Sequence, residues 1–377
     1  MTEKILITGG AGFIGSHLVD NLLKDKDHEI TVLDALEEQV HGKRSIAPEY
    51  LNKRAKFVHG SVTDYNLLET LVKENEVVFH LAAMVGVGQS MYQIKKYVDN
   101  NITGTGNLLD ILANSEHNIK KVVIASSNTI YGEGKHNCPN CGIIYPELRN
   151  AEQLSKKEWE IKCPHCNSKL DPLPTDENTP LNSSSIYAFS KQAQEKMSLL
   201  IGNAYGINTT ILRFFLVYGP RQALSNPYTG VCAIFSSRLF QGKPPIVFED
   251  GLQSRDFVNV SDICQALILT MEKKNAEGEI FNVGSGKPIT VKEIAEILSK
   301  KINPDIKPIY NQQYRIGDIR HCLADISKIK NKLGYNPKVD FHNAIYELIK
   351  WIKLQINSLS DKSQLAIDEL KSKGLIK

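Results

Sequence analysis

The sequence predicts an α/β protein built on a doubly wound parallel sheet. Short apolar runs alternate with amphipathic helical segments over residues 4–131, a glycine-rich turn follows the first run, and the alternation resumes after residue 182. Strands that alternate with helices form βαβ units, in which parallel strands are covered by helices on both faces.

The expected elements follow one another in a regular order. Strands are expected at 4–8, 29–35, 55–61, 77–83, 120–127 and 208–215, and helices at 13–25, 100–115, 185–206, 260–273 and 290–301. Residues 132–182 break the pattern with cysteine, proline and charge, and the tail after residue 355 has a polar, helical pattern.

Composition narrows the class of function. The 377 residues are 42% hydrophobic and 23% charged, which is typical of a globular protein with a sizeable core. A formal net charge of +3 is too small to indicate a nucleic-acid-binding protein. No long apolar run predicts a membrane span, and no basic-then-apolar N-terminal segment predicts secretion, so we expect a cytoplasmic protein.

A phosphate-binding turn is expected between the first strand and the first helix. The segment ITGGAGFIG places Gly9, Gly12 and Gly15 where the chain must turn tightly and approach a pyrophosphate at a helix N-terminus. Asp34 ends the second strand, close to the spacing expected of a ribose-binding acid. A carboxylate there repels a 2′-phosphate, so the pattern predicts a Rossmann-type domain that binds NAD in preference to NADP.

A second motif lies on the helix expected at 185–206. Tyr187 and Lys191 are four residues apart in YAFSK, so both side chains lie on one helix face. A tyrosine titrates near pH ~10, and a neighbouring lysine cation favours its anion. The same spacing occurs by chance in ordinary amphipathic helices, but its place after a dinucleotide-binding half favours a catalytic interpretation.

Further motifs extend this pattern over the chain. They are HLAA at 80–83, DNN at 99–101, SSNTIYG at 126–132, RFFLVYGPRQ at 213–222, GLQSRDFVNVSDI at 251–263, FNVGSG at 281–286 and RIGDIRHCLAD at 315–325. With these motifs the chain resembles the extended short-chain dehydrogenase/reductase family, specifically its nucleotide-sugar epimerases and dehydratases. The resemblance covers roughly residues 1–350 apart from the cysteine-containing segment.

The resemblance implies a division of the chain into parts. An NAD-binding domain would span 1–215, a smaller α/β domain for the nucleotide-diphosphosugar would span 216–355 with some segments returning to the first domain, and 356–377 would form a helical tail. It also implies a homodimer formed through the helices that contain 100–115 and 187–203.

The resemblance further assigns site residues. Tyr187 would be the general base, Ser127 would hydrogen-bond the same sugar oxygen, and Lys191 would hold the nicotinamide ribose and lower the tyrosine pKa. The expected cofactor-binding residues are Gly9, Gly12, Phe13, Ile14, Gly15, Asp34, Ser61, Val62, Leu81, Ala82, Ala83, Asn101, Ser126, Tyr187, Lys191 and Phe214. The expected substrate-binding residues are Ser127, Asn128, Arg221, Arg255, Arg315, Asp318 and Cys322.

Two positions bear on the type of reaction. Family 4,6-dehydratases carry acidic residues directly after the Ser/Thr position, where this chain has Asn128 and Thr129. Neither can act as a carboxylic acid, so the sequence favours 4-epimerisation through a 4-keto sugar, with decarboxylation of a uronic acid as the remaining competitor.

The substrate is less well defined. Arg255 and Arg315 suit a diphosphate because a guanidinium forms bidentate hydrogen bonds, although surface arginines often form ordinary ion pairs. The resemblance places Cys322 where some epimerases carry a bulky tyrosine, and a small residue there leaves room for an N-acetyl group at sugar C2. This favours UDP-N-acetylglucosamine and UDP-N-acetylgalactosamine, or dual use with UDP-glucose and UDP-galactose; the alternative is an ordinary buried cysteine. The combination of the cysteine segment, YGPRQALSNPYTGV and RIGDIRHC is also similar to dTDP-L-rhamnose 4-epimerases.

Three departures and two other classes of function complete the interpretation. Leu216, Ser61 and Val85 replace an asparagine, an aspartate and a lysine that the family often carries.

A non-catalytic nucleotide-sugar-binding protein is disfavoured by the intact trio. A nucleic-acid-binding protein is disfavoured by the mixed charge around the cysteines.

Four of the seven cysteines form two C-x2-C pairs. Cys138, Cys141, Cys163 and Cys166 have a spacing close to that of a zinc ribbon, and four thiolates fill a tetrahedral site, which indicates structural zinc. The alternative is four unmetallated thiols in a loop. Ser127 and Tyr187 are 60 positions apart, against about 25 in the family, so a zinc-ribbon-like core at 138–166 is expected within an insert at 133–180.

Overall fold

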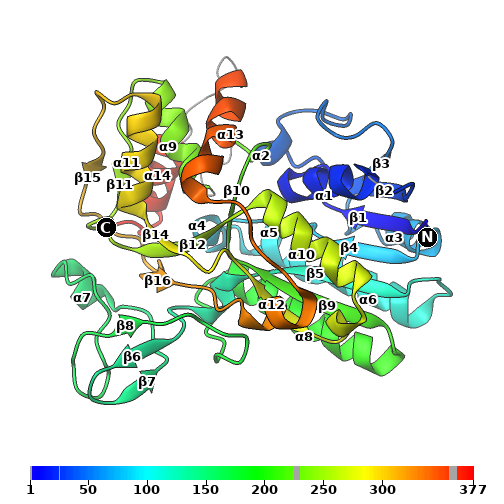
Figure 1. Cartoon of the computed structure of the whole chain (residues 1–377), viewed down its shortest axis with the longest axis horizontal. Helices are drawn as coiled ribbons and strands as arrows, with labels where there is room; N and C mark the ends of the chain where they lie inside the picture. The colour runs from blue at the N-terminus through cyan, green and yellow to red at the C-terminus, as the bar shows by residue number, and fades with distance from the viewer. Residues whose placement is uncertain (1, 25, 225–229, 356–362) are drawn as a thin grey trace.

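Seven parallel strands form the central sheet of the protein (Figure 1). A computed structural model describes residues 2–24, 26–224, 230–355 and 363–377. The strands, in sheet order, are β13 (Ile280–Val283), β9 (Asn208–Phe214), β5 (Lys121–Ser127), β4 (Val77–His80), β1 (Lys4–Thr8), β2 (Glu29–Asp34) and β3 (Lys56–His59). The strand order reverses between β1 and β4, which is where α/β proteins of this kind open a crevice for ligands.

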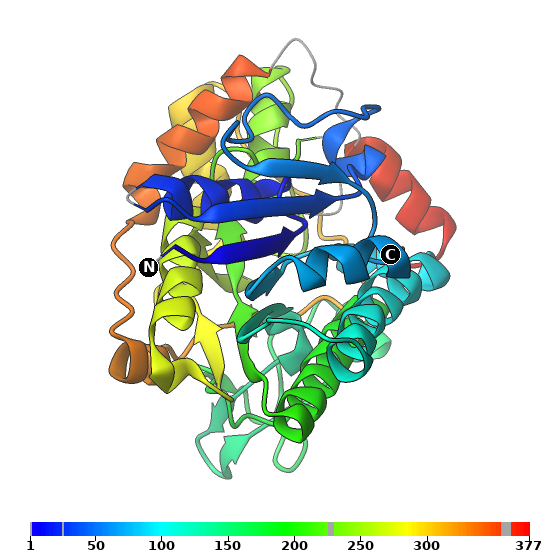
Figure 2. The same cartoon turned by 90° about the vertical axis from the view of Figure 1, so that its right-hand side faces the viewer.

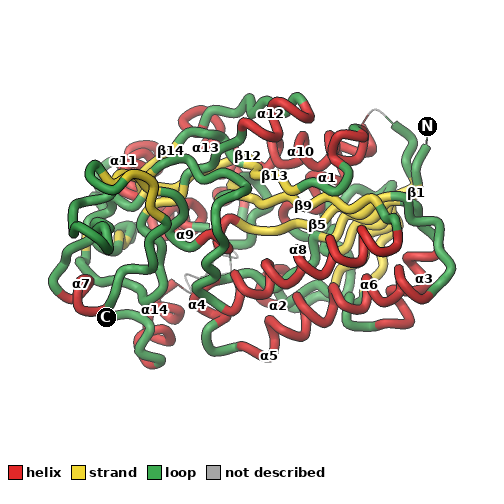
Figure 3. Tube along the Cα trace, turned by 90° about the horizontal axis from the view of Figure 1, so that it is seen from below, coloured by secondary structure: helices red, strands yellow, loops and turns green. Residues whose placement is uncertain are grey.

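Helices cover both faces of this sheet (Figure 3). One face carries α1 (Phe13–Lys24) and α10 (Val260–Glu272), and the other carries α3 (Tyr65–Lys73), α6 (Gly104–Asn114) and α8 (Ile186–Tyr205). The alternation of β1 explains both cores, because Ile5 and Ile7 join the cluster under α1 while Leu6 joins the cluster under α6. The predicted doubly wound α/β fold is confirmed.

The helix expected at 100–115 is part of a longer helical run. It begins with α5 (Ile94–Tyr97), passes through a π-helical turn at Val98–Thr103 and continues as α6. The wide turn directs Asn101 inward, where its side chain accepts a hydrogen bond from Met84 N at 2.7 Å and donates to Ser190 Oγ at 2.9 Å. This turn therefore ties the loop after β4 to α8.

A second, smaller part of the molecule lies beyond the carboxyl ends of the strands. Its main sheet contains β10 (Leu216–Tyr218), β12 (Ser254–Asn259), β14 (Pro288–Thr290) and β16 (His321–Cys322), and β11 (Ile246–Val247) pairs with β15 (Ile309–Tyr310). The helices are α9 (Val231–Phe240), α11 (Val291–Ile302) and α13 (Phe341–Leu354), and α12 (Ser327–Leu333) lies near the parallel sheet. β13 follows these elements in sequence but pairs with β9.

The cysteine-containing segment forms a projection of its own at the lower left of Figure 1. It consists of β6 (His136–Cys138), β7 (Gly142–Ile144), β8 (Asp171–Pro172) and α7 (Ala151–Ser155). β6 pairs antiparallel with both of the other strands. The segment is therefore an insertion between β5 and α8.

The C-terminal helix, α14 (Ser363–Ser372), packs back on the body of the protein. Leu370 and Ile376 are buried beside Phe248, and backbone hydrogen bonds of 3.0 and 3.1 Å join Tyr314 to Lys377. Figure 2 shows this helix in red at the right, and Figure 3 places it at the end of the molecule that carries the smaller sheet, away from α3 and α6. Within the described residues, no helix is long and apolar enough to cross a membrane.

Candidate active site

A cavity of about 650 Å³ opens at the carboxyl ends of the parallel strands. Its walls come from the glycine-rich turn, from the ends of β2, β4 and β5, from α8 and from the smaller sheet. Every residue expected to bind the cofactor lines this cavity apart from Asn101, and so do the predicted substrate residues Ser127, Asn128, Arg255, Arg315 and Asp318. Residues distant in sequence therefore meet where the strand order predicts a ligand site.

The glycine-rich turn has no room for side chains. Gly9 has a φ of +69°, and a Cβ there would lie 2.8 Å from the backbone nitrogen of Ala82. A Cβ on Gly15 would lie 2.5 Å from the carbonyl oxygen of Gly9. The turn can therefore lie this close to the neighbouring strand end and to α1 only as glycine, and it leaves the N-terminus of α1 facing the cavity.

Asp34 is held at the end of β2 by backbone groups. Its Oδ2 accepts a hydrogen bond from Ala11 N at 3.0 Å, and its Oδ1 accepts one from Leu36 N at 2.9 Å. A carboxylate oxygen can accept more than one hydrogen bond, so Asp34 retains capacity toward the cavity that it lines. The tight glycine turn and this oriented acid together fit a dinucleotide.

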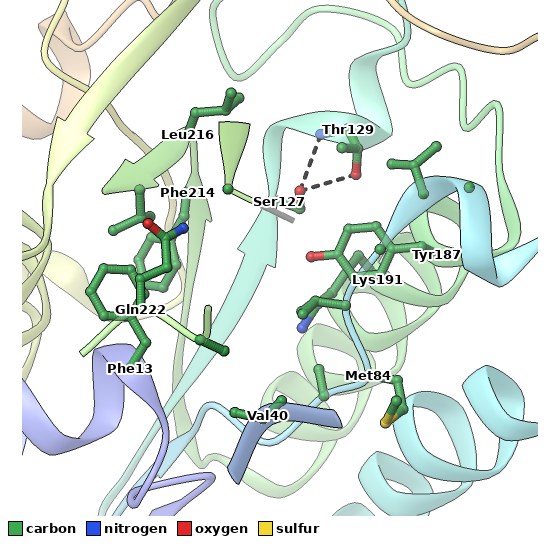
Figure 4. Close-up of a pocket in the computed structure, with 18 of the residues that line it drawn as sticks. Phe13, Val40, Met84, Ser127, Thr129, Tyr187, Lys191, Phe214, Leu216 and Gln222 are labelled. Carbon is green, nitrogen blue, oxygen red and sulfur yellow. Dashed lines mark hydrogen bonds between the residues drawn. The ribbon is translucent and has the colours of Figure 1, made fainter. Parts of the chain in front are cut away.

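The trio predicted from the sequence converges on one wall of the cavity (Figure 4). Ser127 ends β5, and its Oγ accepts hydrogen bonds from Thr129 N at 3.3 Å and from Thr129 Oγ1 at 3.0 Å. Tyr187 and Lys191 lie one turn apart on α8, and the Tyr187 oxygen points toward Ser127. Lys191 Nζ donates a 2.8 Å hydrogen bond to Ala125 O, which fixes the ammonium beneath the tyrosine.

Burial perturbs the two titratable members of the trio in opposite directions. It raises the pKa of Tyr187, and the hydrogen bond with Ser127 opposes that rise. It lowers the pKa of Lys191 to about 7, opposed by the negative charge of Glu195. An isolated tyrosinate or an isolated ammonium is therefore unfavourable here, and a charged pair is the arrangement in which each ion is compensated.

No carboxylate directly follows Ser127. Asn128 lines the cavity, and its Nδ2 lies 3.2 Å from the sulfur of Cys322. Cys322 lies behind Asn128, outside the cavity lining, and burial raises the pKa of its thiol to about 11. Thr129, whose contact with Ser127 the sequence did not predict, also lines the cavity.

Three further predicted residues have contacts that sequence reasoning did not anticipate. Arg255 lines the cavity, but its guanidinium donates to Asp318 Oδ1 at 3.4 Å and to the backbone of 319–320. Arg221 lies outside the lining, where it pairs with Asp20 at 2.7 Å. Asn101 is buried behind the cavity and holds the loop after β4 in place.

The C-terminal tail forms part of the cavity wall, a role that was not predicted from the sequence. Ala366, Ile367 and Leu370 line it, together with Phe248, on whose ring the guanidinium of Arg315 stacks at 4.4 Å. The spacing of these three apolar residues along α14 was the available signal, because it gives a short polar helix one apolar face.

The four predicted cysteines come together in the projecting segment. Their sulfur atoms lie within 4.8 Å of one another, and Cys138 Sγ is 3.4 Å from Cys166 Sγ. A tetrahedral zinc with Zn–S bonds of about 2.3 Å needs sulfur separations of about 3.8 Å, so the set fits that ion. Hydrogen bonding with Ser168 lowers the pKa of Cys166 to about 5, whereas burial raises the pKa of Cys138 and the hydrogen bond with Cys166 raises that of Cys141. The fit to zinc therefore rests on the sulfur geometry.

These features define a class of protein: an α/β enzyme with a dinucleotide-binding glycine-rich turn and a cavity that extends from that turn to the smaller sheet. The chain belongs to the NAD dependent epimerase/dehydratase family, which it matches over residues 5–150 and 164–284. The gap in that match, 151–163, falls within the cysteine-containing segment.

Individual relatives cover nearly the whole chain. A dTDP-L-rhamnose 4-epimerase of Burkholderia thailandensis is 31% identical, over 94% of this chain and 96% of that protein. A UDP-N-acetyl-alpha-D-glucosaminuronate decarboxylase of Bacillus cytotoxicus is also 31% identical, over 94% and 98%. The structure of a UDP-N-acetylglucosamine 4-epimerase from Methanobrevibacter ruminantium, in complex with UDP-N-acetylmuramic acid, superposes with a TM-score of 0.75 at 32% identity, covering 94% of this chain and 99% of that one.

Proposed function

We propose that the protein is an NAD-dependent nucleotide-diphosphosugar 4-epimerase, with UDP-N-acetylglucosamine or UDP-glucose as the first candidate substrates. The observation that carries this proposal is the convergence of Ser127, Tyr187 and Lys191 in one cavity, with Asn128 and Thr129 where a dehydratase needs acids. Cys322 lies behind Asn128 and outside the cavity lining, so its small size does not favour one sugar over another.

The trio has a defined task in this reaction. NAD, when held at the glycine-rich turn, would supply the hydride acceptor and donor for sugar C4. Tyr187 Oη removes the proton of the sugar 4-hydroxyl as general base while the hydride leaves C4. It returns that proton to the same oxygen when the hydride adds to the opposite face of the 4-keto sugar, and Ser127 hydrogen-bonds this oxygen. Lys191 compensates the tyrosinate charge, which burial would otherwise disfavour.

A substrate panel tests the proposal directly. The purified protein is incubated with UDP-N-acetylglucosamine, UDP-glucose, dTDP-L-rhamnose and UDP-N-acetylglucosaminuronate, and the anomeric protons are followed by NMR. We expect interconversion of C4 epimers in at least one case, and Tyr187→Phe should lower kcat by about 100-fold to 10,000-fold. Accumulation of a 4-keto-6-deoxy product or release of CO2 would assign another reaction.

A dTDP-L-rhamnose 4-epimerase is the second candidate. The similarity to the Burkholderia enzyme supports it, and its chemistry at C4 is the same. The two candidates differ only in nucleotide and sugar, so the relative kcat/KM values within the panel separate them.

We also propose that the four cysteines hold a structural zinc ion. Four sulfur ligands leave no open coordination position, so the metal would hold the projecting segment together and take no part in the redox step. Protein purified without chelator should contain one zinc per chain by elemental analysis. Cys141→Ser should lose that zinc, while Cys232→Ser, which removes a buried cysteine outside the cluster, should retain it.

The ion pairs of the lysines in the projecting segment argue against a nucleic-acid-binding face there. Lys156 pairs with Glu152 at 2.6 Å, and Lys162 pairs with Glu158 in the same way. Neighbouring carboxylates thus neutralise the cations that phosphates would require. The proposed partners are the nucleotide-diphosphosugar and a second copy of the chain, because α8 exposes Phe189 and Leu200 on the helix expected at the dimer contact.

A further inference from the structure

A network of buried charges joins the projecting segment to the wall of the cavity. Arg320 is fully buried, and its guanidinium donates to Glu160 Oε1 at 2.6 and 3.1 Å. The same guanidinium donates to Asp250 at 2.8 and 2.9 Å and to Glu249 Oε2 at 3.0 Å. Glu160 lies between the two cysteine pairs in sequence, so the segment with the cysteines supplies one of the counterions of Arg320.

A second arginine, Arg149, also joins the projecting segment to the cavity wall. Arg149, also in the projecting segment, forms a two-point ion pair with Glu249 at 2.9 and 3.0 Å. It also donates to Trp159 O at 3.0 Å and to Asp318 O at 3.1 Å. Glu249 therefore accepts from Arg149 and Arg320 together, and the backbone at Asp318 is held by a side chain of the segment.

The stretch 318–321 lies between this network and the cavity. Asp318 and Ile319 line the cavity, whereas Arg320 points away from it into the charge network. Arg255 Nη1 donates to Arg320 O at 2.8 Å and so holds the stretch from the β12 side. His321 continues the stretch with Nε2 at 3.3 Å from Glu160 Oε2.

We infer that Arg149 and Glu160 are positioning residues for nucleotide-sugar binding: they set the place of Asp318 and Arg255 in the cavity without touching the ligand. The inference rests on the proposed function for the identity of the ligand. Side chains with several charge-assisted hydrogen bonds in a buried setting have few alternative positions, so they fix the backbone that they bind. A displacement of about 1 Å in a binding wall can cost about 100-fold in activity.

The contribution is expected in binding and not in the chemical step. Tyr187, Ser127 and Lys191 are held by β5 and α8, which make none of the network contacts described above. Weakening the network should therefore raise KM and the Kd for nucleotide while kcat stays nearly constant. A purely structural role would instead lower thermal stability and leave both binding constants unchanged.

Glu160→Gln is the variant of choice. It removes one charge but keeps the size of the side chain, and Arg320 retains Glu249 and Asp250 as counterions, so the fold should survive. Glu158→Gln is the matched control, because Glu158 lies two residues away and pairs only at the surface with Lys162. Arg149→Lys is a second test, since lysine keeps the charge but cannot form the two-point pair with Glu249.

The measurements are KM and kcat with the substrate found in the panel, and the Kd of UDP and of dTDP by calorimetry. For Glu160→Gln and Arg149→Lys we expect KM and Kd to rise roughly 3-fold to 30-fold, with kcat within about 2-fold of the parent protein. Glu158→Gln should match the parent. Unchanged KM and Kd in both test variants would overturn the inference, whatever happens to their melting temperatures.

The calorimetry separates this inference from the proposed function. If no panel substrate is converted, the proposed function fails, but the nucleotide Kd still reports whether the network positions the wall. Removal of the cysteine-bound metal with EDTA should raise the Kd of the parent protein and change that of Glu160→Gln less, because the variant has already lost the connection. Equal increases in both proteins would contradict it.

Discussion

Replacing Glu133 with glutamine should remove a pH dependence of stability that the structure attributes to one buried carboxyl group. Glu133 follows the 3-10 turn after β5 and is almost completely buried. Its Oε2 accepts a hydrogen bond from Arg320 N at 2.7 Å, whereas its Oε1 has no hydrogen-bond partner among the described residues and lies 3.7 Å from Arg149 Nε. Burial raises the pKa of Glu133 to about 7, although the charge of Arg149 opposes the rise.

The magnitude follows from linkage. In the unfolded chain the pKa of this carboxyl is 4.5, so between roughly pH 4.5 and pH 7 the folded protein binds more protons than the unfolded chain. The resulting stabilisation is complete below the lower pKa and is lost as the pH rises through the higher one. Between about pH 5.5 and pH 8 the contribution falls by about 2 kcal/mol.

Glutamine does not titrate, and its carbonyl oxygen can still accept from Arg320 N. The free energy of unfolding of Glu133→Gln, relative to the parent protein, should therefore increase by about 2 kcal/mol from pH 5.5 to pH 8. Urea unfolding at a series of pH values measures it, and Glu152→Gln, a surface change in the same segment, should give a curve parallel to the parent. A parallel curve for Glu133→Gln as well would refute the raised pKa.

Three other changes test separate parts of the molecule. Gly15→Ala should abolish stable NAD retention, because its Cβ would lie 2.5 Å from Gly9 O; the nucleotide released on denaturation, measured by absorbance, checks this. Deleting residues 363–377 should raise the substrate KM about tenfold, since it removes the apolar wall at Leu370, and steady-state kinetics with unchanged NAD content would confirm it. Leu200→Glu should convert the proposed dimer to a monomer in light scattering, and a dimer that persists would place the contact elsewhere.

The parts predicted most fully from the sequence are those built from local signals. Short apolar runs that alternate with helices predicted six of the seven strands of the parallel sheet and missed only β13. The glycine turn was recognisable because its geometry admits only glycine. Tyr187 and Lys191 were found because helical spacing alone places them on one face. The four cysteines were found because metal ligands recur at fixed intervals, and their sulfur atoms do lie together.

What escaped prediction depends on pairings between distant segments. Arg255 was expected to grip a diphosphate, and nothing local to its motif indicates that its guanidinium binds the backbone of 319–320. Arg221 was expected at the substrate, but an ion pair with Asp20, two hundred residues earlier, holds it outside the cavity. The tail was predicted as a helix, yet only its docking beside Phe248 makes it part of the cavity wall.

The cofactor side of the cavity was easier to predict than the substrate side because the two sides are assembled differently. The cofactor side is assembled from strand ends and the turns that follow them, so each contributing residue is fixed by its own βαβ unit. The substrate side is assembled from 318–321, from the segment between the sheet elements and from α14, which meet only in the folded chain. Changes in those segments can alter which sugar nucleotide binds without disturbing Tyr187. The identity of the substrate should therefore depend on residues such as Arg149 and Leu370, which lie outside every motif that identified the chemistry.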